Sequence, residues 1–194
     1  MLFMAAGGSS YNNLLNYITA SVLENLCLEG QLNPALPFIQ RSSCRITKLV
    51  LDGGWTDDSR DIILRVLELL PTLEHLVMDR FAGMSSRPTQ FWEAIRVSET
   101  GDGVCTNLKY LAFRWIRDGE YGEDATINVF FSAIRSRRGH GLRMVQLLTI
   151  SRSPYRSRLE EGRRDFGEDV DIVFLAQKES DAFMRRAKVD YYEY

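Results

Sequence analysis

The chain has 194 residues, which is enough for one domain with a sizeable hydrophobic core. Its 24 basic and 26 acidic side chains give a formal net charge of -2, so the composition provides no drive toward nucleic acid or anionic membranes. The N-terminal stretch MLFMAAGGSSYNN is too short and too polar for a secretory signal or a membrane-spanning helix. Three widely spaced cysteines indicate reduced thiols in the cytoplasm or the nucleus: Cys27, Cys44 and Cys105.

The first 22 residues hold one short amphipathic stretch, YNNLLNYI. Leu14, Leu15 and Ile18 have the spacing of one helix face. We therefore expect residues 1–22 to form an N-terminal segment with half a helix that covers the adjacent end of the core.

A six-residue pattern with apolar first, fourth and sixth positions recurs along the chain. The steps between copies are 23, 27, 35 and 34 residues. We predict a strand at each copy, because the last two apolar residues, spaced by two, point from one side of a strand into a core. The copies are LENLCL from Leu23, ITKLVL from Ile46, LEHLVM from Leu73, LKYLAF from Leu108 and LRMVQL from Leu142.

Helical patterns fill the intervals between these strands. DSRDIILRVLELLP carries apolar residues on one helical face, an aspartate at its start and Pro71 as its stop. Three further stretches show the same periodicity: NPALPFIQR, RPTQFWEAI and EDATINVFFSAI. A short helix from about Arg158 and a strand over Val170–Phe174 complete a last unit.

Tandem strand–helix units cannot bury their own apolar faces, so stacked units share one continuous core. We predict an α/β fold, a leucine-rich-repeat-like solenoid of about five to six irregular units over residues 23–174, with a parallel sheet on one face and helices on the other. The unequal steps leave a generic α/β domain with a mostly parallel sheet as the alternative. Residues 175–194 are expected to form a C-terminal cap helix, with Phe183, Met184 and Ala187 on its apolar side, and a loose acidic tail.

The order of units resembles a known family. SVLENLCLEG followed by FIQRSSCRITKLVLDG is similar to the leucine-rich-repeat region of F-box proteins of mushroom-forming (basidiomycete) fungi. LRVLELLPTLEHLVMDR and FFSAIRSRRGHGLRMVQLLT resemble later units, so the likeness covers about Val22 to Ile150. The resemblance implies an intracellular protein-interaction module that selects proteins for ubiquitination.

In that family an N-terminal F-box docks on the adaptor of a ubiquitin ligase. The residues before Leu23 lack the Leu-Pro-x-Glu-like opening of an F-box, so we expect no F-box in this sequence. The adaptor is then an expected partner only if an F-box exists in a longer parent protein.

A protein partner is expected on the concave strand face, to which the strand residues between and beside the core leucines point. Glu29, Asp52 and Asp79 would stack on neighbouring strands and repel one another, so a basic segment of the partner would relieve that cost. A solvated acidic edge is the alternative, and the apolar stripe of Val50, Val77 and Ala112 is also explained by β-propensity alone. The candidate contact residues are Glu29, Asp52, Asp79, Lys48, His75, Val50, Val77, Tyr110 and Arg114.

The sequence offers little catalytic chemistry. His75 and His140 are far apart, and no spacing of His, Cys, Asp or Glu is typical of a metal site. The stretch GDGVC precedes a strand, whereas a phosphate-binding loop follows one, so we read it as a flexible loop. The basic cluster from Arg135 to Arg143 complements a helix C-terminus. We predict no enzyme, no cofactor, no metal and no nucleic-acid or membrane partner; the alternatives are a truncated remnant without independent function and a small α/β enzyme.

Overall fold

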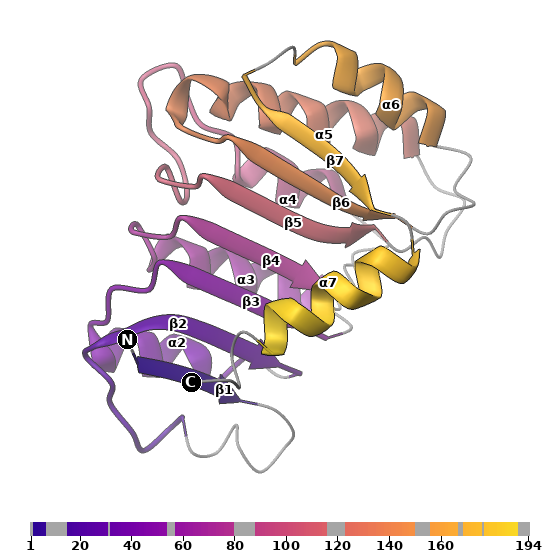
Figure 1. The fold of residues 1–194 in the computed structure, drawn as a ribbon. Coiled ribbons are helices and arrows are strands. Elements are labelled where there is room, and N and C mark those ends of the chain that lie inside the picture. Colours follow the sequence, from indigo (N-terminus) through magenta and orange to yellow (C-terminus); the bar gives the residue numbers. More distant parts are fainter. Residues whose placement is uncertain are drawn as a thin grey trace.

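The computed structural model describes residues 2–6, 15–30, 32–53, 57–79, 88–115, 123–149, 156–166, 169–175 and 177–189. Within them, seven strands form one sheet whose spatial order is the chain order, and all neighbours run parallel (Figure 1). The strands are β1 Leu2–Ala6, β2 Leu23–Glu29, β3 Lys48–Asp52, β4 His75–Asp79, β5 Tyr110–Trp115, β6 Met144–Thr149 and β7 Asp171–Leu175. The predicted α/β class and parallel sheet are confirmed.

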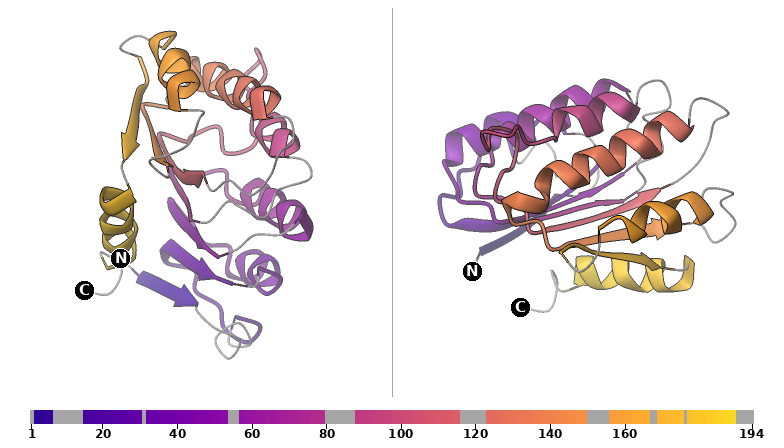
Figure 2. Two further views of the ribbon diagram at one scale, coloured as in Figure 1. Left: turned by 90° about the vertical axis from the view of Figure 1, so that its right-hand side faces the viewer. Right: turned by 90° about the horizontal axis from the view of Figure 1, so that it is seen from above.

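One helix follows each strand from β2 to β7. The helices are α2 Ala35–Ser42, α3 Asp57–Glu68, α4 Pro88–Ala94, α5 Glu123–Arg137 with the short 3-10 turn Arg138–His140, α6 Arg156–Arg164 and α7 Gln177–Val189. Of the described helices, α2 to α6 lie on one side of the sheet and α7 lies on the other (Figure 2). We call the side that carries α7 the strand face.

The repeated apolar pattern builds the main core, because its copies pair in register across five strands. The fourth positions form one column on neighbouring strands and the sixth positions form another. Both columns are buried against the apolar sides of the helices in one continuous cluster. The two columns are Leu26, Leu49, Leu76, Leu111 and Val145, and Leu28, Leu51, Met78, Phe113 and Leu147.

Aromatic rings pack together in the part of the main core between α4, β5 and α5. The ring centroid of Trp92 lies 4.9 Å from those of Phe113 and Phe130, in tilted and edge-on orientations that aromatic pairs favour. Helix α6 packs close to α5 because Gly162 has no side chain: a Cβ there would lie 2.2 Å from the ring of Phe131.

The N-terminal segment holds a strand that the sequence did not predict. The first half of the stretch expected as half a helix, including Leu14, lies outside the described residues; in the second half residues 15–17 form a turn, and Leu15 is buried in the main core. Residues Leu2–Ala6 form an additional strand, β1, that pairs in parallel with β2. Leu2, Met4 and Ala6 stand in register with Leu23, Leu26 and Leu28 of β2, with an irregularity between Leu2 and Phe3 that takes up the extra residue of β2.

The C-terminal helix forms, but it does not cap the end of the core as expected. Helix α7 crosses the strand face of the sheet, opposite the other helices (Figure 1). The physical reason is a second apolar cluster, separate from the main core, in which Met184 of α7 packs with strand residues. A half-apolar helix is most stable where it covers an apolar surface, and the strand face offers one.

Arg137 at the end of α5 joins this helix to the loop between α4 and β5. The side chain is 1 % exposed and donates hydrogen bonds to the backbone carbonyls of Ile95 (2.7 Å), Cys105 (2.8 Å) and Val104. The stretch GDGVC, read from sequence as a flexible loop, therefore ends in two carbonyls that accept hydrogen bonds from one buried guanidinium.

We predict that Arg137→Ala lowers the free energy of unfolding by about 3 kcal/mol, because buried carbonyls lose their donor. The matched control is Arg138→Ala, which removes an ion pair with Asp169 whose side chains are both about half exposed. That change is expected to cost less than about 1 kcal/mol. Urea denaturation followed by circular dichroism measures both values, and equal losses would contradict the structural role of Arg137.

Candidate partner-binding face

The strand face carries the three columns of side chains that the sequence placed there. Strand pairing sets Lys48 beside His75 and His75 beside Tyr110. It sets Asp52 between Glu29 and Asp79. The middle column is Cys27, Val50, Val77 and Ala112. The predicted neighbours on this face are therefore neighbours in the structure.

The middle column is a contact surface rather than a by-product of β-propensity. Val50, Val77 and Ala112 are 0 %, 2 % and 0 % exposed, although they point away from the main core. They form the strand-face cluster with Cys27 and with Met184 of α7, and Tyr110, Leu175 and Phe183 pack against it. The chain's own C-terminal helix thus occupies the apolar stripe on which the partner was expected.

The acidic column is not a solvated edge along its whole length. Glu29 is exposed, whereas Asp52 and Asp79 are 5 % and 4 % exposed. Arg114 places Nε 2.8 Å from Oδ1 of Asp79 and Nη1 2.9 Å from Oδ1 of Asp181 in α7. The cation beside Asp79 therefore comes from the chain itself, and it joins the sheet to α7.

A cavity of about 570 Å³ opens beside α7. Three of its lining residues, Lys48, His75 and Tyr110, are the first residues of β3, β4 and β5. The Tyr110 hydroxyl donates a hydrogen bond of 2.6 Å to Oε1 of Gln146, and the rings of Tyr110 and His75 are 5.6 Å apart. Helix α7 closes the other side with Glu179, Phe183, Arg186 and Ala187.

Two titratable groups of the cavity, His75 and Tyr110, are held in their neutral forms. Loss of hydration lowers the pKa of His75, and the positive charge of Lys48 lowers it further. Burial raises the pKa of the Tyr110 phenol. At pH 7 the imidazole is therefore neutral and the phenol keeps its proton, so the two rings offer hydrogen bonds and aromatic surface.

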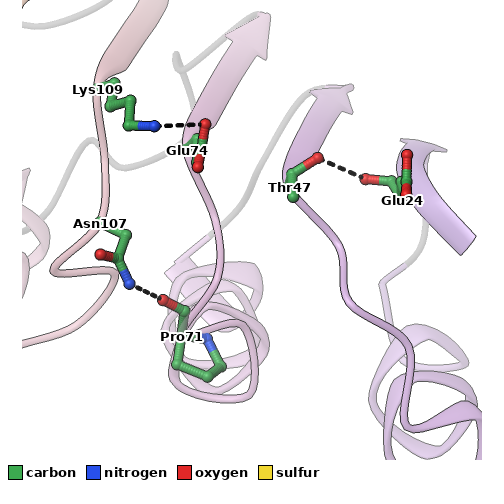
Figure 3. A network of polar contacts seen from close by, with 6 residues as sticks. All are labelled: Glu24, Thr47, Pro71, Glu74, Asn107 and Lys109. Atoms are coloured by element: carbon green, nitrogen blue, oxygen red, sulfur yellow. Dashed lines mark hydrogen bonds and ion pairs between the residues drawn. The ribbon is translucent and has the colours of Figure 1, made fainter.

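A polar network holds the strand starts that line this cavity (Figure 3). The carbonyl of Thr47 accepts hydrogen bonds from the backbone N–H groups of Glu74 and His75, both at 2.9 Å, and the carbonyl of Glu74 accepts from Lys109 and Tyr110. Nζ of Lys109 also lies 2.8 Å from Oε2 of Glu74, and this contact lowers the pKa of that carboxyl. The network extends the parallel ladder by one step beyond each strand start, which fixes where His75 and Tyr110 emerge.

A second set of contacts repeats this link at the preceding turns. Thr47 donates through its backbone N–H to the carbonyl of Glu24 at 2.8 Å, and its hydroxyl lies 3.4 Å from the same oxygen. Nδ2 of Asn107 donates to the carbonyl of Pro71 at 2.8 Å (Figure 3). Neighbouring repeats are thus joined by side chains as well as by the sheet.

The basic cluster contacts its own chain. Arg135 lies 2.5 Å from the carboxylate of Asp165 and 5.7 Å above the ring of Phe166. Arg138 pairs with Asp169, and Arg137 is buried. These contacts explain the three arginines without an anionic partner.

The described part of the chain holds no group of three or more His, Cys, Asp or Glu side chains arranged to bind a metal ion. No helix within it is long and apolar enough to cross a membrane. Burial raises the pKa of the Cys105 thiol to about 12, so that thiol is not activated.

Sequence reasoning missed the residues that α7 contributes to this face. Asp181 pairs with Arg114, and Phe183, Met184 and Ala187 face the strands or the cavity. The signal was present in the spacing of Phe183, Met184 and Ala187, which gives α7 an apolar side, and in the apolar column that had no other cover.

Comparison of the chain with protein-family models, with curated proteins and with solved structures finds no match.

We predict that Arg114→Met lowers the free energy of unfolding by about 3 kcal/mol, because the buried Asp79 carboxylate loses its cation. The double variant Arg114→Met with Asp79→Asn is expected to lose less than the single variant, since the amide carries no charge. Urea denaturation of the parent, both single variants and the double variant gives the coupling. Simple additivity of the two single losses would contradict the pairing.

Stability is also expected to depend on the protonation of His75. Because the pKa of His75 in the folded chain lies below its ordinary value of 6.5, the unfolded chain binds the proton more tightly. This contribution is full above pH 6.5 and is lost as the pH falls from 6.5 through the folded-state pKa. The free energy of unfolding of the parent should fall more steeply between pH 6.5 and 5 than that of His75→Gln, and parallel curves would contradict the assignment.

Proposed function

We propose that this chain is a protein-interaction module, built as a leucine-rich-repeat-like solenoid, that binds a protein partner on its strand face. The module resembles the substrate-recognition repeats of F-box ubiquitin-ligase receptors. It acts without a cofactor and without catalysis.

Two features support the leucine-rich-repeat type. The seven strands follow one another in space in the order of the chain, and each strand from β2 to β6 leads into a helix on the same side. The apolar positions of five units stand in the same two columns. Stacking of similar units around one shared core is the physical basis of solenoids.

The observation that carries the binding proposal is the occupied strand face. It binds an amphipathic helix through an apolar column and an ion pair, with α7 as the helix. A surface with a buried apolar centre and charged surroundings has the composition of a protein interface. The same surface is therefore suited to protein recognition.

The candidate contact residues fall into two groups. Glu29, Lys48, His75 and Tyr110 lie outside the strand-face cluster or line the cavity beside α7. The second group is joined to α7 directly or through Arg114, so these residues serve a partner only when α7 is moved. Val50 and Val77 share a cluster with Met184, and Arg114 pairs with Asp181 of α7 and with the buried Asp79. Asp52 is buried between Glu29 and Asp79, so the attraction for a basic segment of the partner comes chiefly from Glu29.

The position of the cavity does not favour the enzyme alternative. Parallel α/β enzymes bind substrates at the carboxyl ends of the strands. Here three of the lining residues open their strands at the amino ends: Lys48, His75 and Tyr110.

The binding proposal is tested with a quantitative pull-down from an extract of a mushroom-forming fungus. Glu29→Lys with Lys48→Glu alters the strand face, and the matched control Glu68→Lys with Arg65→Glu makes the same charge exchanges on exposed residues of α3. A specific partner should be recovered at least about tenfold less with the strand-face variant, and equally with the control.

Each result of the pull-down has a consequence. Equal loss in both variants would move the binding surface off the strand face, and the absence of any specific protein would support the remnant alternative. Recovery of a ubiquitin-ligase adaptor would contradict the expectation that this link requires an F-box in a longer parent protein.

A further inference from the structure

The side of helix α7 that faces the sheet can be identified from helical geometry. At 100° per residue, Met184 and Ala187 lie at the centre of one side, with Asp181 and Phe183 at its two borders. The burial agrees, since Met184 and Ala187 are 3 % and 7 % exposed and Asp181 and Phe183 are of intermediate exposure. The side that meets the sheet is therefore a narrow apolar strip with a carboxylate at one border.

One charged contact joins α7 to the strand face. The first half of α7 is acidic, with Glu179 and Asp181, and Asp181 pairs with Arg114 of β5. The second half is basic in sequence and runs toward β2 (Figure 1), and its Arg186 lines the cavity together with Glu179 of the first half and Lys48 of β3. The basic residues of that half are Arg185, Arg186 and Lys188. A helix with acidic residues first and basic residues last also suits its own macrodipole.

A single residue separates β7 from α7, because β7 ends at Leu175 and α7 begins at Gln177. This short tether keeps α7 at a high effective concentration beside the face, in the millimolar range or above. Any external helix that uses the same face must compete with this intramolecular one.

We propose that α7 is an exchangeable occupant of the strand face, and that the partner is an amphipathic helix of the same design which takes its place. Such a helix seats apolar side chains on Val50, Val77 and Ala112, sets a carboxylate against Arg114 and carries basic residues in its second half. The inference rests on the proposed protein-binding function and names the class of partner. It also makes the free chain self-blocked until α7 is displaced.

The test uses the full chain and its own thiols. Cys27 belongs to the strand-face cluster and is 7 % exposed, whereas Cys105 is 5 % exposed in the main core. Met184→Glu places a charge in the strand-face cluster and should free α7, and Lys178→Glu changes an exposed residue of the same helix as the control. Alkylation by iodoacetamide, resolved by mass spectrometry, should be at least about tenfold faster at Cys27 in Met184→Glu, with Cys105 and the control unchanged.

External binding is measured with a labelled peptide of the α7 sequence, residues 177–189, by fluorescence anisotropy. The peptide should bind Met184→Glu at least about tenfold more tightly than the parent or Lys178→Glu, because the face is then open. A peptide carrying Asp181→Lys should lose this binding, since it places a cation against Arg114.

An unchanged alkylation rate at Cys27 would overturn the proposal that α7 exchanges. Faster alkylation without peptide binding would overturn the proposed partner class. If alkylation of Cys105 becomes faster together with that of Cys27, the Met184→Glu chain has unfolded. The full-length variant Asp181→Lys, which leaves the apolar cluster intact, is then measured in the same way and decides between the outcomes. These results come from purified components, so they are independent of the pull-down. If neither the parent chain nor the Met184→Glu variant captured a specific protein in the pull-down, the protein-binding function itself would be rejected.

Discussion

The in-register stacking of parallel strands is the constraint on which the rest of the structure depends. Because side chains alternate along a strand, each column of core leucines on one side requires a column of residues on the other. Parallel sheets are stable when both sides are covered, since both carry apolar side chains. Within the described residues, the leucine side is covered by the five helices α2 to α6, and the opposite side is covered by the single helix α7.

This unequal cover gives the strand face its character. One helix protects the apolar column of Val50, Val77 and Ala112 but leaves the columns beside it accessible in part. Arg114 lies at the border of this column and forms ion pairs with two carboxylates, Asp79 of the sheet and Asp181 of α7. The polar network before the strands fixes the other border of the face. A surface that is ordered, mixed in chemistry and incompletely covered is well adapted to recognise a second molecule.

The sequence predicted the columns residue by residue, because a recurring pattern with period two fixes both the side and the register of a strand. It did not reveal β1, since LFMAA is short and its register depends on a shift between Leu2 and Phe3. It predicted a helix near Met184 but not its position. An apolar side shows that a helix packs against the rest of the protein, but it does not show which surface the helix covers. The sequence predicted repulsion between Asp52 and Asp79, but Arg114 pairs with Asp79 and reduces it. The positive charge of Arg114 in the following strand was visible in the sequence.

The order of synthesis gives the position of α7 a consequence for the nascent chain. Every strand under α7 precedes it in the sequence, so the ribosome completes the sheet before the helix that covers its second side. During that interval the valines of the strand face are exposed to solvent while the leucine side is already packed against helices. Apolar strand surface exposed in this way is open to aggregation and to chaperones. The helix is therefore also the last step of protection during translation, and the speed at which it is made sets how long the half-covered sheet is at risk.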